Sequence, residues 1–460
     1  MSQASDYGVS MPAEAVDRDK RPATCARVAV VGTGIAGLSA AHALGKVCDV
    51  TLFERLPSLG MSAHAWSAGD AELQVDVPIR VMYPDYYPRL LALLAEAGVA
   101  TAPVDGSSSF SFADGSTYFS YRNLQWRARA LPLPSASPQW ALSAGRIALD
   151  YLRFLRAADS VELPRQMTLR EFLDRGRYSN SFRQQFVLPV FATICTCTNA
   201  QLLDAPASVI LGYASGGLRP STLQRAVGGA RSIATRLAAG CADVQCGAEV
   251  EWIRRAAEGV LVRRRGAEAA QCFDHVLVAT QANHALRLVE GLSAAARKAL
   301  QGIEYTPVDV LLHSDPRLMP ARPRSWAPAN YFIDDAWSRP MATLWVNRVY
   351  PALRTEDNVF QTVAPEMAPR DDSIISAVGF ERPLVTPDSL DSVAALDRVQ
   401  RDPDRRIWFC GSYAQPGVPL LESGASSGLD LAARILDQIE ATGAQGKPHV
   451  PRASGDLASR

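Results

Sequence analysis

The chain has 460 residues, which is more than one hydrophobic core usually serves and predicts two closely connected domains. Apolar residues make up 48% and charged residues 20%, as in soluble globular proteins that bury a large core. The 47 basic and 47 acidic residues cancel. This balance excludes an overall field that attracts nucleic acid or an anionic membrane, so a small molecule is the expected partner.

The cysteines and the N-terminal segment indicate the cellular compartment in which we expect the protein. Eight cysteines without regular spacing indicate reduced thiols, and the cytoplasm is the expected location. Residues 1–26 carry acidic residues and no apolar run, so we expect a flexible tail and no secretory signal. No stretch approaches the roughly 18 apolar residues of a membrane span, which leaves only peripheral membrane contact open. The oligomeric state also stays open.

An apolar run from Arg27 to Val31 is the first expected strand. The turn GTGIAG follows at once, and an Ala-rich amphipathic pattern continues from Leu38 to Leu44. A second apolar run, from Asp49 to Phe53, ends on Glu54. Strand, turn, helix and strand in this order predict the first half of a Rossmann fold.

The middle of the chain has a different character. Residues 106–221 are rich in serine, proline and aromatic residues around two expected helices, at 140–157 and 169–175. This composition is typical of an inserted domain. Residues 291–397 again mix expected strands with prolines and aromatic residues, and we assign them to the same second domain.

Between and after these stretches the α/β pattern returns. A helix at 229–239, a strand through Val250 and an apolar strand from His275 to Ala279 are expected to rejoin the first sheet. Near the end of the chain, a strand from Arg406 to Cys410 precedes a helix at about 423–439.

The glycine-rich turn is the strongest chemical signal. A bound diphosphate needs backbone N–H groups that it can approach closely, and glycines in a turn before a helix provide them. Glu54 stands near the roughly 20-residue offset of a carboxylate that accepts hydrogen bonds from a ribose diol. These features together predict dinucleotide binding. The residues expected to face the diphosphate are Gly32, Gly34, Ile35, Ala36 and Gly37.

The same turn serves NAD and FAD, and two features favour FAD. The nucleotide unit is completed by segments hundreds of residues later, which suits a long, buried cofactor. Gly411 precedes a helix whose N–H groups could face a flavin pyrimidine edge, although ordinary packing of that helix on the sheet is the alternative. No cysteine matches a linkage site, since Cys410 is expected in a buried strand, so we expect noncovalent FAD.

The expected fold is therefore α/β. A Rossmann-type FAD-binding domain is built from discontinuous segments, beside an α+β substrate domain. The expected boundaries are 27–105, 222–290 and 398–440 for the FAD-binding domain, 106–221 and 291–397 for the substrate domain, and 441–460 for a second flexible tail.

Three longer stretches carry a resemblance to known proteins. They are VDVPIRVMYPDYYPRL at 75–90, HSDPRLMPARPRSWAPANY at 313–331 and WFCGSYAQPGVPLLESGASSGL at 408–429. With the glycine turn they make the chain, from Arg27 to Ile439, resemble the FAD-dependent amine oxidase and protoporphyrinogen oxidase superfamily. Within it, the chain is most similar to bacterial flavoproteins of poorly defined substrate whose relatives are associated with fatty-acid modification.

The resemblance implies further cofactor contacts. Glu54 and Arg55 would hold the ADP half, Val250 would meet the adenine through its backbone, and Gly411 and the 422–428 segment would meet the flavin. The remaining expected cofactor-binding residues are Gly60, Met61, Ser62, Ala279, Ser412, Glu422, Gly424 and Ser427.

The sequence also departs from the family pattern near the expected flavin ring. The second glycine pair is reduced to Gly60 followed by Met61, and Pro78 and Tyr83 stand where similar sequences have glycine and asparagine. Leu421-Glu422-Ser423-Gly424 replaces His-Glu-Asp-Gly. The resemblance therefore implies the binding fold more firmly than the reaction.

Candidate catalytic residues have structural alternatives. His64 follows the Gly60 loop and could exchange a proton as a neutral imidazole, or serve only the structure. Glu422 could orient the substrate or a base, or interact favourably with its helix dipole. Arg80 could pair with a substrate carboxylate.

An aromatic wall beside the flavin is a further possibility, with core packing as the alternative for each residue. Its candidates are Tyr83, Trp326, Tyr331 and Tyr413, of which the last two are also catalytic candidates. The Cys195-Thr196-Cys197 sequence has no second ligand cluster, so we expect no metal.

The expected reaction is two-electron dehydrogenation, either C–N oxidation or C–C desaturation, of a small or lipid-like substrate. A second glycine motif for NAD(P)H is absent from the sequence, so electrons should pass to O2 or another acceptor. The chain has only four lysines, all outside the family-like segments, which mildly favours desaturation or a different proton path. The alternatives are a flavin-assisted isomerase or hydratase and a non-catalytic FAD-bound scaffold.

Overall fold

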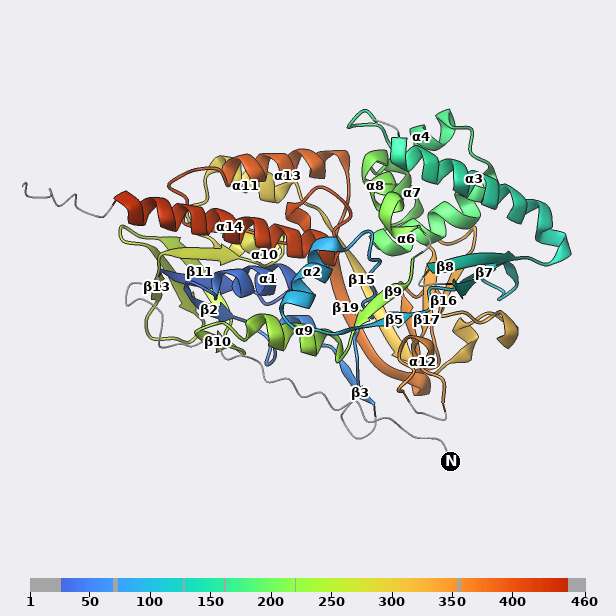
Figure 1. Cartoon of the computed structure of the whole chain (residues 1–460), viewed down its shortest axis with the longest axis horizontal. Helices are drawn as coiled ribbons and strands as arrows, with labels where there is room; N and C mark the ends of the chain where they lie inside the picture. The colour runs from blue at the N-terminus through green and yellow to red at the C-terminus, as the bar shows by residue number, and fades with distance from the viewer. Residues whose placement is uncertain are drawn as a thin grey trace, which may run out of the picture.

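The computed structural model describes residues 26–68, 73–126, 129–160, 163–219, 221–353 and 357–445. The expected tails, 1–26 and 441–460, lie outside the described residues except for residue 26 and residues 441–445. Figure 1 shows two units side by side, with β2, α1 and α14 in the left one and β16, β17, α3, α4, α6, α7 and α8 in the right one.

A five-stranded parallel sheet forms the core of the first unit, in the order β10-β2-β1-β14-β20. Its strands come from distant parts of the chain: β1 (Arg27–Val31), β2 (Asp49–Phe53), β10 (Asp243–Gln245), β14 (His275–Val278) and β20 (Ile407–Phe409). The predicted Rossmann-type fold built from discontinuous segments is confirmed.

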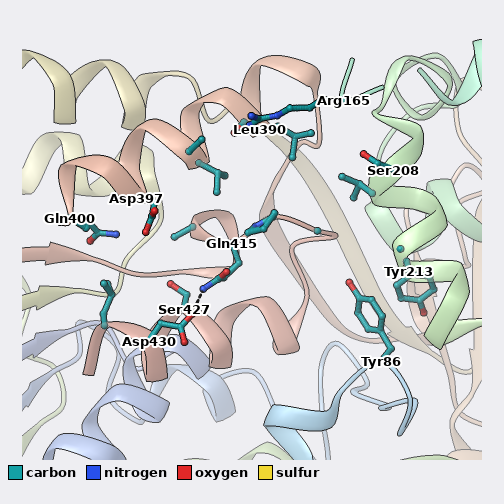
Figure 2. Close-up of a pocket in the computed structure, with 18 of the residues that line it drawn as sticks. Tyr86, Arg165, Ser208, Tyr213, Leu390, Asp397, Gln400, Gln415, Ser427 and Asp430 are labelled. Atoms are coloured by element: carbon teal, nitrogen blue, oxygen red, sulfur yellow. Dashed lines mark hydrogen bonds between the residues drawn. The ribbon is translucent and has the colours of Figure 1, made fainter. Parts of the chain in front are cut away.

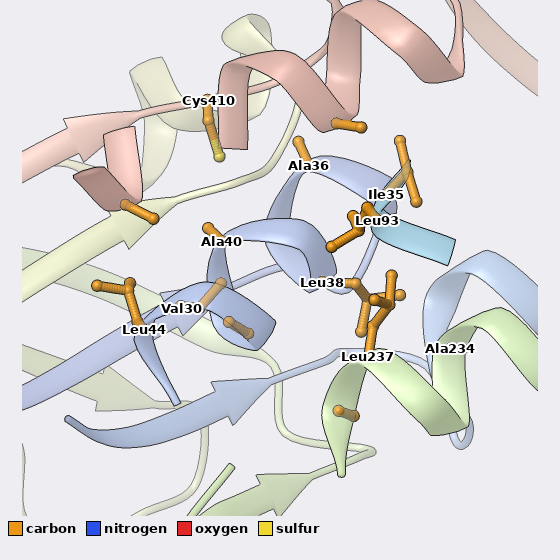
Figure 3. Packing of buried hydrophobic residues seen from close by; sticks show 14 of the residues in the cluster. Val30, Ile35, Ala36, Leu38, Ala40, Leu44, Leu93, Ala234, Leu237 and Cys410 are labelled. Carbon is orange, nitrogen blue, oxygen red and sulfur yellow. The ribbon is translucent and has the colours of Figure 1, made fainter. Parts of the chain in front are cut away.

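Both faces of this sheet are covered, which explains why its strands are continuous apolar runs. Val28 and Val30 of β1 face one cluster, and Ala29 and Val31 face the other. The first cluster is covered by α1 (Ile35–Leu44), α2 (Pro88–Glu96), α9 (Gly229–Ala238) and α14 (Leu421–Gln445). Figure 3 shows Ile35, Ala36 and Ala40 of α1 packed between this sheet and α14.

The strand through Val250 does not rejoin the parallel sheet as expected. It is β11 (Val250–Arg255), which pairs antiparallel with β12 (Val260–Arg264), and β12 pairs with β13 (Gln271–Phe273). The connections are short, and a parallel pairing would need a crossover of a dozen or more residues. The short strand β10 takes the sheet edge instead.

The second unit is built on an eight-stranded mixed sheet in the order β19-β15-β18-β17-β16-β6-β7-β8. The parallel pair β6–β16 joins the two expected substrate segments, with Phe110 opposite Tyr331. The strands are β6 (Ser108–Phe112), β7 (Thr117–Trp126), β8 (Arg129–Ser135), β15 (Tyr305–His313), β16 (Ala329–Ile333), β17 (Met341–Trp345), β18 (Phe360–Val363) and β19 (Ile374–Pro383).

Helices cover part of this sheet and bury a second large cluster of aromatic residues. They are α3 (Ala141–Ser160), α4 (Leu169–Arg175), α5 (Asn180–Phe182), α6 (Leu188–Cys195), α7 (Asn199–Asp204) and α8 (Ala207–Gly217), and the short α12 (Val346–Val349) precedes β18. Two small strand pairs complete the structure: β3 (Trp66–Ala68) with β4 (Leu73–Val75), and β5 (Thr101–Val104) with β9 (Leu223–Ala226).

The packing differs from the expected domain boundary in one respect. The helices α11 (Ala294–Gln301) and α13 (Pro387–Val399) lie in the stretch assigned to the substrate domain. Their buried residues Leu300 and Leu396 instead belong to the cluster beneath the parallel sheet, beside α10 (Ala282–Leu288). No helix among the described residues is long and apolar enough to cross a membrane.

Candidate functional site

The turn between β1 and α1 requires glycine at two positions. Gly32 has a φ of +101°, and a Cβ there would lie 2.9 Å from the Ala279 carbonyl oxygen. A Cβ on Gly37 would lie 2.1 Å from the Gly32 carbonyl oxygen. A Cβ on Gly34 would meet no atom within 4 Å. The turn is therefore tight against Ala279 and open at Gly34.

The N-terminus of α1 is suited to an anion. Gly34 is its N-cap, no side chain caps it, and its first turn has no acidic residue. The first N–H groups of a helix lack intrahelical acceptors and carry the positive end of the helix dipole. Open space and free donors at Gly34 and the start of α1 therefore fit a diphosphate group.

Glu54 lies beside the same turn. Its Oε2 accepts hydrogen bonds from the Thr33 backbone N–H at 3.1 Å and from the Thr33 hydroxyl, and its Oε1 accepts one from the Leu56 N–H at 3.0 Å. A carboxylate has about four acceptor positions, so Glu54 can still accept hydroxyl donors of a ribose. The neighbouring Arg55 is exposed.

Thr33 is a site residue that we did not single out from the sequence. Its hydroxyl also accepts a hydrogen bond from the Gly60 N–H at 2.7 Å, and its carbonyl accepts one from the Met61 N–H at 3.2 Å. A Cβ on Gly60 would lie 2.7 Å from Glu54 Oε2. The 3-10 turn at Gly60–Ser62 is thereby held against the glycine turn, and Ser62 donates to the Leu59 carbonyl.

The segment before β11 approaches from the other side. The Ala248 N–H donates to the Glu54 carbonyl and the Gly247 N–H donates to the Leu56 carbonyl, both at 2.7 Å. These bonds place Val250 two residues from the contact with Glu54, and its contact with the adenine stays a prediction.

The C-terminal segment also contacts the start of α1. A Cβ on Gly424 would lie 2.6 Å from the Ile35 side chain, 3.8 Å from the Ala36 nitrogen and 3.9 Å from the Ser412 nitrogen. A Cβ on Gly428 would lie only 2.1 Å from the Ala36 carbonyl oxygen. Glycines spaced by four residues on α14 therefore let its backbone touch α1 and bring residues 411–412 to the N-terminus of α1.

Ser427 and Tyr413 support the same segment. The Gly411 N–H donates to the Ser427 hydroxyl at 3.2 Å. Tyr413 packs in the cluster beneath the parallel sheet, and its buried hydroxyl has no hydrogen-bond partner among the described residues. A Cβ on Gly411 would lie 2.4 Å from the Tyr413 ring, so the ring packs directly on this glycine.

Glu422 contacts a helix other than its own. Its Oε1 accepts from the Arg89 N–H at 3.0 Å, and its Oε2 accepts from the Leu90 N–H at 2.9 Å. Both oxygens thus cap the N-terminus of α2. This contact was not predicted from the sequence, whereas the place of Glu422 in the first turn of α14 agrees with the predicted interaction with its own helix dipole.

His64 and Arg80 lie near one another. The His64 ring packs edge-on against Phe380 at a centroid distance of 5.5 Å. Partial burial, then the charges of Arg80 and Arg55, hold the pKa of His64 below its ordinary value, so the imidazole is neutral at pH 7. Arg80 donates to the Pro78 carbonyl at 3.4 Å and lies 3.9 Å from the buried carboxylate of Asp76.

An apolar cavity of about 350 Å³ lies between β7, β8, α3 and α8. Tyr83 is one of its lining residues, and burial followed by the neighbouring Tyr121 and Tyr331 raises the pKa of the Tyr83 phenol well above its usual value. Tyr331 stacks on Phe110 at a centroid distance of 5.0 Å. Other lining residues are Phe119, Tyr121, Pro132, Pro134, Ile147, Tyr151, Leu152, Phe186 and Leu223.

The four expected wall aromatics do not form one wall. Tyr83 and Tyr331 are neighbours, whereas Tyr413 lies beneath the parallel sheet. Trp326 donates from Nε1 to the Pro320 carbonyl at 2.8 Å and packs edge-on against Trp345 and Phe360. These contacts hold Trp326 against residues of β17 and β18, and Trp326 is not among the residues that line the apolar cavity.

A second cleft, of about 770 Å³, was not foreseen from the sequence. Figure 2 shows it between α13, α14 and α8, with Tyr86 and Tyr213 on one side and Gln415, which donates to Asp430, on the other. None of its lining residues belongs to the glycine turn. Within the described ranges no group of three or more His, Cys, Asp or Glu residues could hold a metal ion.

Comparison with sequence families identifies the first unit. Residues 30–97 match a family described as NAD(P)-binding Rossmann-like domain. No match was found among curated protein sequences.

Solved structures superpose over most of the chain at low sequence identity. The CLA-producing fatty acid isomerase from P. acnes has a TM-score of 0.65 and 14% identity, over 89% of this chain and 98% of that one. Cyclohexylamine oxidase from Brevibacterium oxydans IH-35A has a TM-score of 0.63 and 15% identity, over 91% and 100%. A candidate protoporphyrinogen oxidase from Exiguobacterium sp. 255-15 has a TM-score of 0.61 and 15% identity, over 91% and 99%. The chain therefore shares its fold with these flavin-containing amine oxidase-like proteins, and its first unit contains a Rossmann-like domain.

Proposed function

We propose that the protein binds FAD noncovalently and dehydrogenates a lipid-like substrate by two electrons, which pass to O2 or another acceptor. The observation that carries the proposal is the uncapped, open N-terminus of α1 at Gly34, faced by Ser412 and Gly424 of the C-terminal segment. A site that combines residues from the N-terminal and C-terminal parts of the chain suits a long cofactor better than a short one.

The chain's own residues have separate tasks toward FAD. The N–H groups of Ile35 and Ala36 would face the diphosphate, Glu54 the ribose, Val250 the adenine, and the 411–412 segment the flavin half. When bound, FAD supplies the two-electron acceptor that the side chains lack.

The apolar cavity is the proposed substrate site. Its volume of about 350 Å³ and its aromatic lining suit an apolar chain rather than a charged polyamine. Tyr83 keeps its phenol protonated and can donate a hydrogen bond to the substrate. Neutral His64 can accept a proton and Arg80 can bind a carboxylate, but neither side chain lines this cavity, so neither is assigned to the substrate.

A flavin-assisted isomerase without net redox is the second candidate. The fold likeness to the fatty acid isomerase favours it, as does the position of the lysines. Among the described residues the two lysines are Lys46 and Lys298, and both are exposed, so neither supplies a lysine base to the cavity.

The visible spectrum of the purified protein, followed by release and mass of its chromophore, tests the cofactor. Anaerobic mixing with an unsaturated fatty acid, and separately with a primary amine, tests the reaction. Bleaching that air reverses supports the dehydrogenase, and product formation without bleaching supports the isomerase. A flavin that neither substrate reduces, with no product, would favour the scaffold, and a protein that binds NAD but no FAD would refute the proposal.

A further inference from the structure

The outer face of α3 is unusually apolar for a helix in solvent. Leu142, Leu149 and Leu152 are 82%, 62% and 52% exposed. Residues spaced by three, four or seven positions lie on one side of a helix, so these leucines form one stripe. All exposed leucines found among the described residues lie on α3, β7 and β8, the other three being Leu124, Leu131 and Leu133.

Positive charge accompanies this stripe. Arg146, Arg153 and Arg156 are exposed on α3 at positions interleaved with the leucines. The one carboxylate between them, Asp150, is buried and accepts hydrogen bonds from Arg153 and the Ser179 N–H. The exposed face therefore combines leucines and arginines from residue 142 to residue 156, and one helical turn further the exposed carboxylate of Asp159 pairs with Arg219.

The stripe borders the apolar cavity. Leu152 is both exposed and a lining residue of that cavity, and Ala148 lies one helical turn before it in the same wall. Pro132 and Pro134 of β8 line the opposite wall, while Leu131 and Leu133 alternate with them and are exposed. Both walls of the cavity thus continue outward into exposed leucines.

We propose that α3 and the β7–β8 hairpin dock on the surface of an anionic phospholipid bilayer. Leucines gain by leaving water at the headgroup boundary, and arginines among them pair with lipid phosphates. A second protein of mixed surface charge would not need a mainly basic polar component. The cavity would then open toward the bilayer, and this last point rests on the proposed function, whereas the docking does not.

Co-sedimentation with lipid vesicles tests the docking. The full chain should bind vesicles that contain phosphatidylglycerol, bind phosphatidylcholine vesicles much more weakly, and be released by high salt. The double variant Leu142→Ser/Leu149→Ser should lower the vesicle partition coefficient by about tenfold or more. Val47→Ser is the matched control, because Val47 is 55% exposed on the far unit and should leave binding unchanged.

Several results would overturn the docking. They are wild-type protein that stays in solution with both vesicle types, equal binding to both, or equal binding by the double variant. Self-association in analytical ultracentrifugation that the double variant abolishes, without vesicle binding, would assign the stripe to a second copy of the chain. A colourless protein that still binds anionic vesicles would refute the proposed function alone, so the two failures are distinguishable.

Discussion

Single atoms decide whether the N-terminus of α1 can receive a diphosphate. Gly34 has no neighbour within 4 Å of a Cβ position, so a side chain there would enter the open space without disturbing the fold. Gly32 and Gly37 differ, because a Cβ on either would meet backbone atoms. Gly34 is therefore the position at which cofactor binding can be separated from folding.

Gly34→Asp should weaken FAD binding by at least about tenfold, because its carboxylate would repel the diphosphate. A tenfold loss of affinity corresponds to about 1.4 kcal/mol of binding free energy. FAD titration followed by flavin fluorescence measures the change. Gly145→Asp is the control, since Gly145 is also exposed with no neighbour within 4 Å. Unchanged FAD affinity in Gly34→Asp would remove the diphosphate from this turn.

Between elements, α1 and α14 cross at close range. This crossing depends on Gly424 and Gly428, whose missing side chains let the two helix backbones meet at Ile35 and Ala36. The same crossing brings residues 411–412 to the glycine turn. The packing of α1 on α14 therefore also sets the geometry of the proposed FAD site.

Gly428→Ala should lower the free energy of unfolding by about 2 kcal/mol, because its Cβ would overlap the Ala36 carbonyl oxygen and force the helices apart. Urea denaturation measures the loss. Gly212→Ala is the matched control, since Gly212 is an exposed helical glycine with no neighbour within 4 Å, and it should gain about 0.5–1 kcal/mol. Equal stability of both variants would contradict the tight crossing.

Glu422 links the same helix to α2 by capping it. Glu422→Gln should destabilise the fold by about 1 kcal/mol, because the neutral amide offers one acceptor oxygen and loses the favourable charge at the N-terminus of α2. Thermal unfolding measures the loss. The rate of flavin reduction by substrate should stay unchanged, and a large fall in that rate at saturating FAD would return Glu422 to the reacting centre.

At the scale of the whole molecule, two buried histidines among the described residues, one in each unit, make the stability depend on pH. Burial, followed by the charge of Arg406, lowers the pKa of His275 to about 4, and burial lowers the pKa of His313 to about 4. His275 accepts a hydrogen bond from the Trp408 indole at 3.4 Å, and His313 shares one with the Thr362 hydroxyl at 2.8 Å.

Stability should therefore fall as pH drops from about 6.5 toward 4. In this window the unfolded histidines, with pKa near 6.5, bind protons that the folded ones do not, at up to about 1.4 kcal/mol per pH unit for each group. Urea denaturation from pH 7 to pH 4.5 measures the slope, and His275→Gln should remove about half of the histidine contribution. A slope that His275→Gln leaves intact would rule out its part in the linkage.

Local patterns accounted for the start of the site. The run from Arg27 to Val31, the glycine turn and Glu54 follow one another within 28 residues, so strand, turn and helix preferences act together and predict the Rossmann half without distant information. The apolar strands from His275 and before Cys410 were recognisable for the same reason. The long-range order of the sheet strands could be anticipated only through the Rossmann pattern.

The sequence by itself therefore determined the Rossmann motif, the fold class and the need for glycine at the turn, because these depend on neighbouring residues. Only the tertiary structure decided that β11 leaves the parallel sheet, that Trp326 packs apart from Tyr83, and that Glu422 caps α2. These outcomes depend on which surfaces meet across hundreds of residues. Periodicity assigns a side chain to a face, but the partner on that face is chosen by packing and hydrogen bonding of the whole chain.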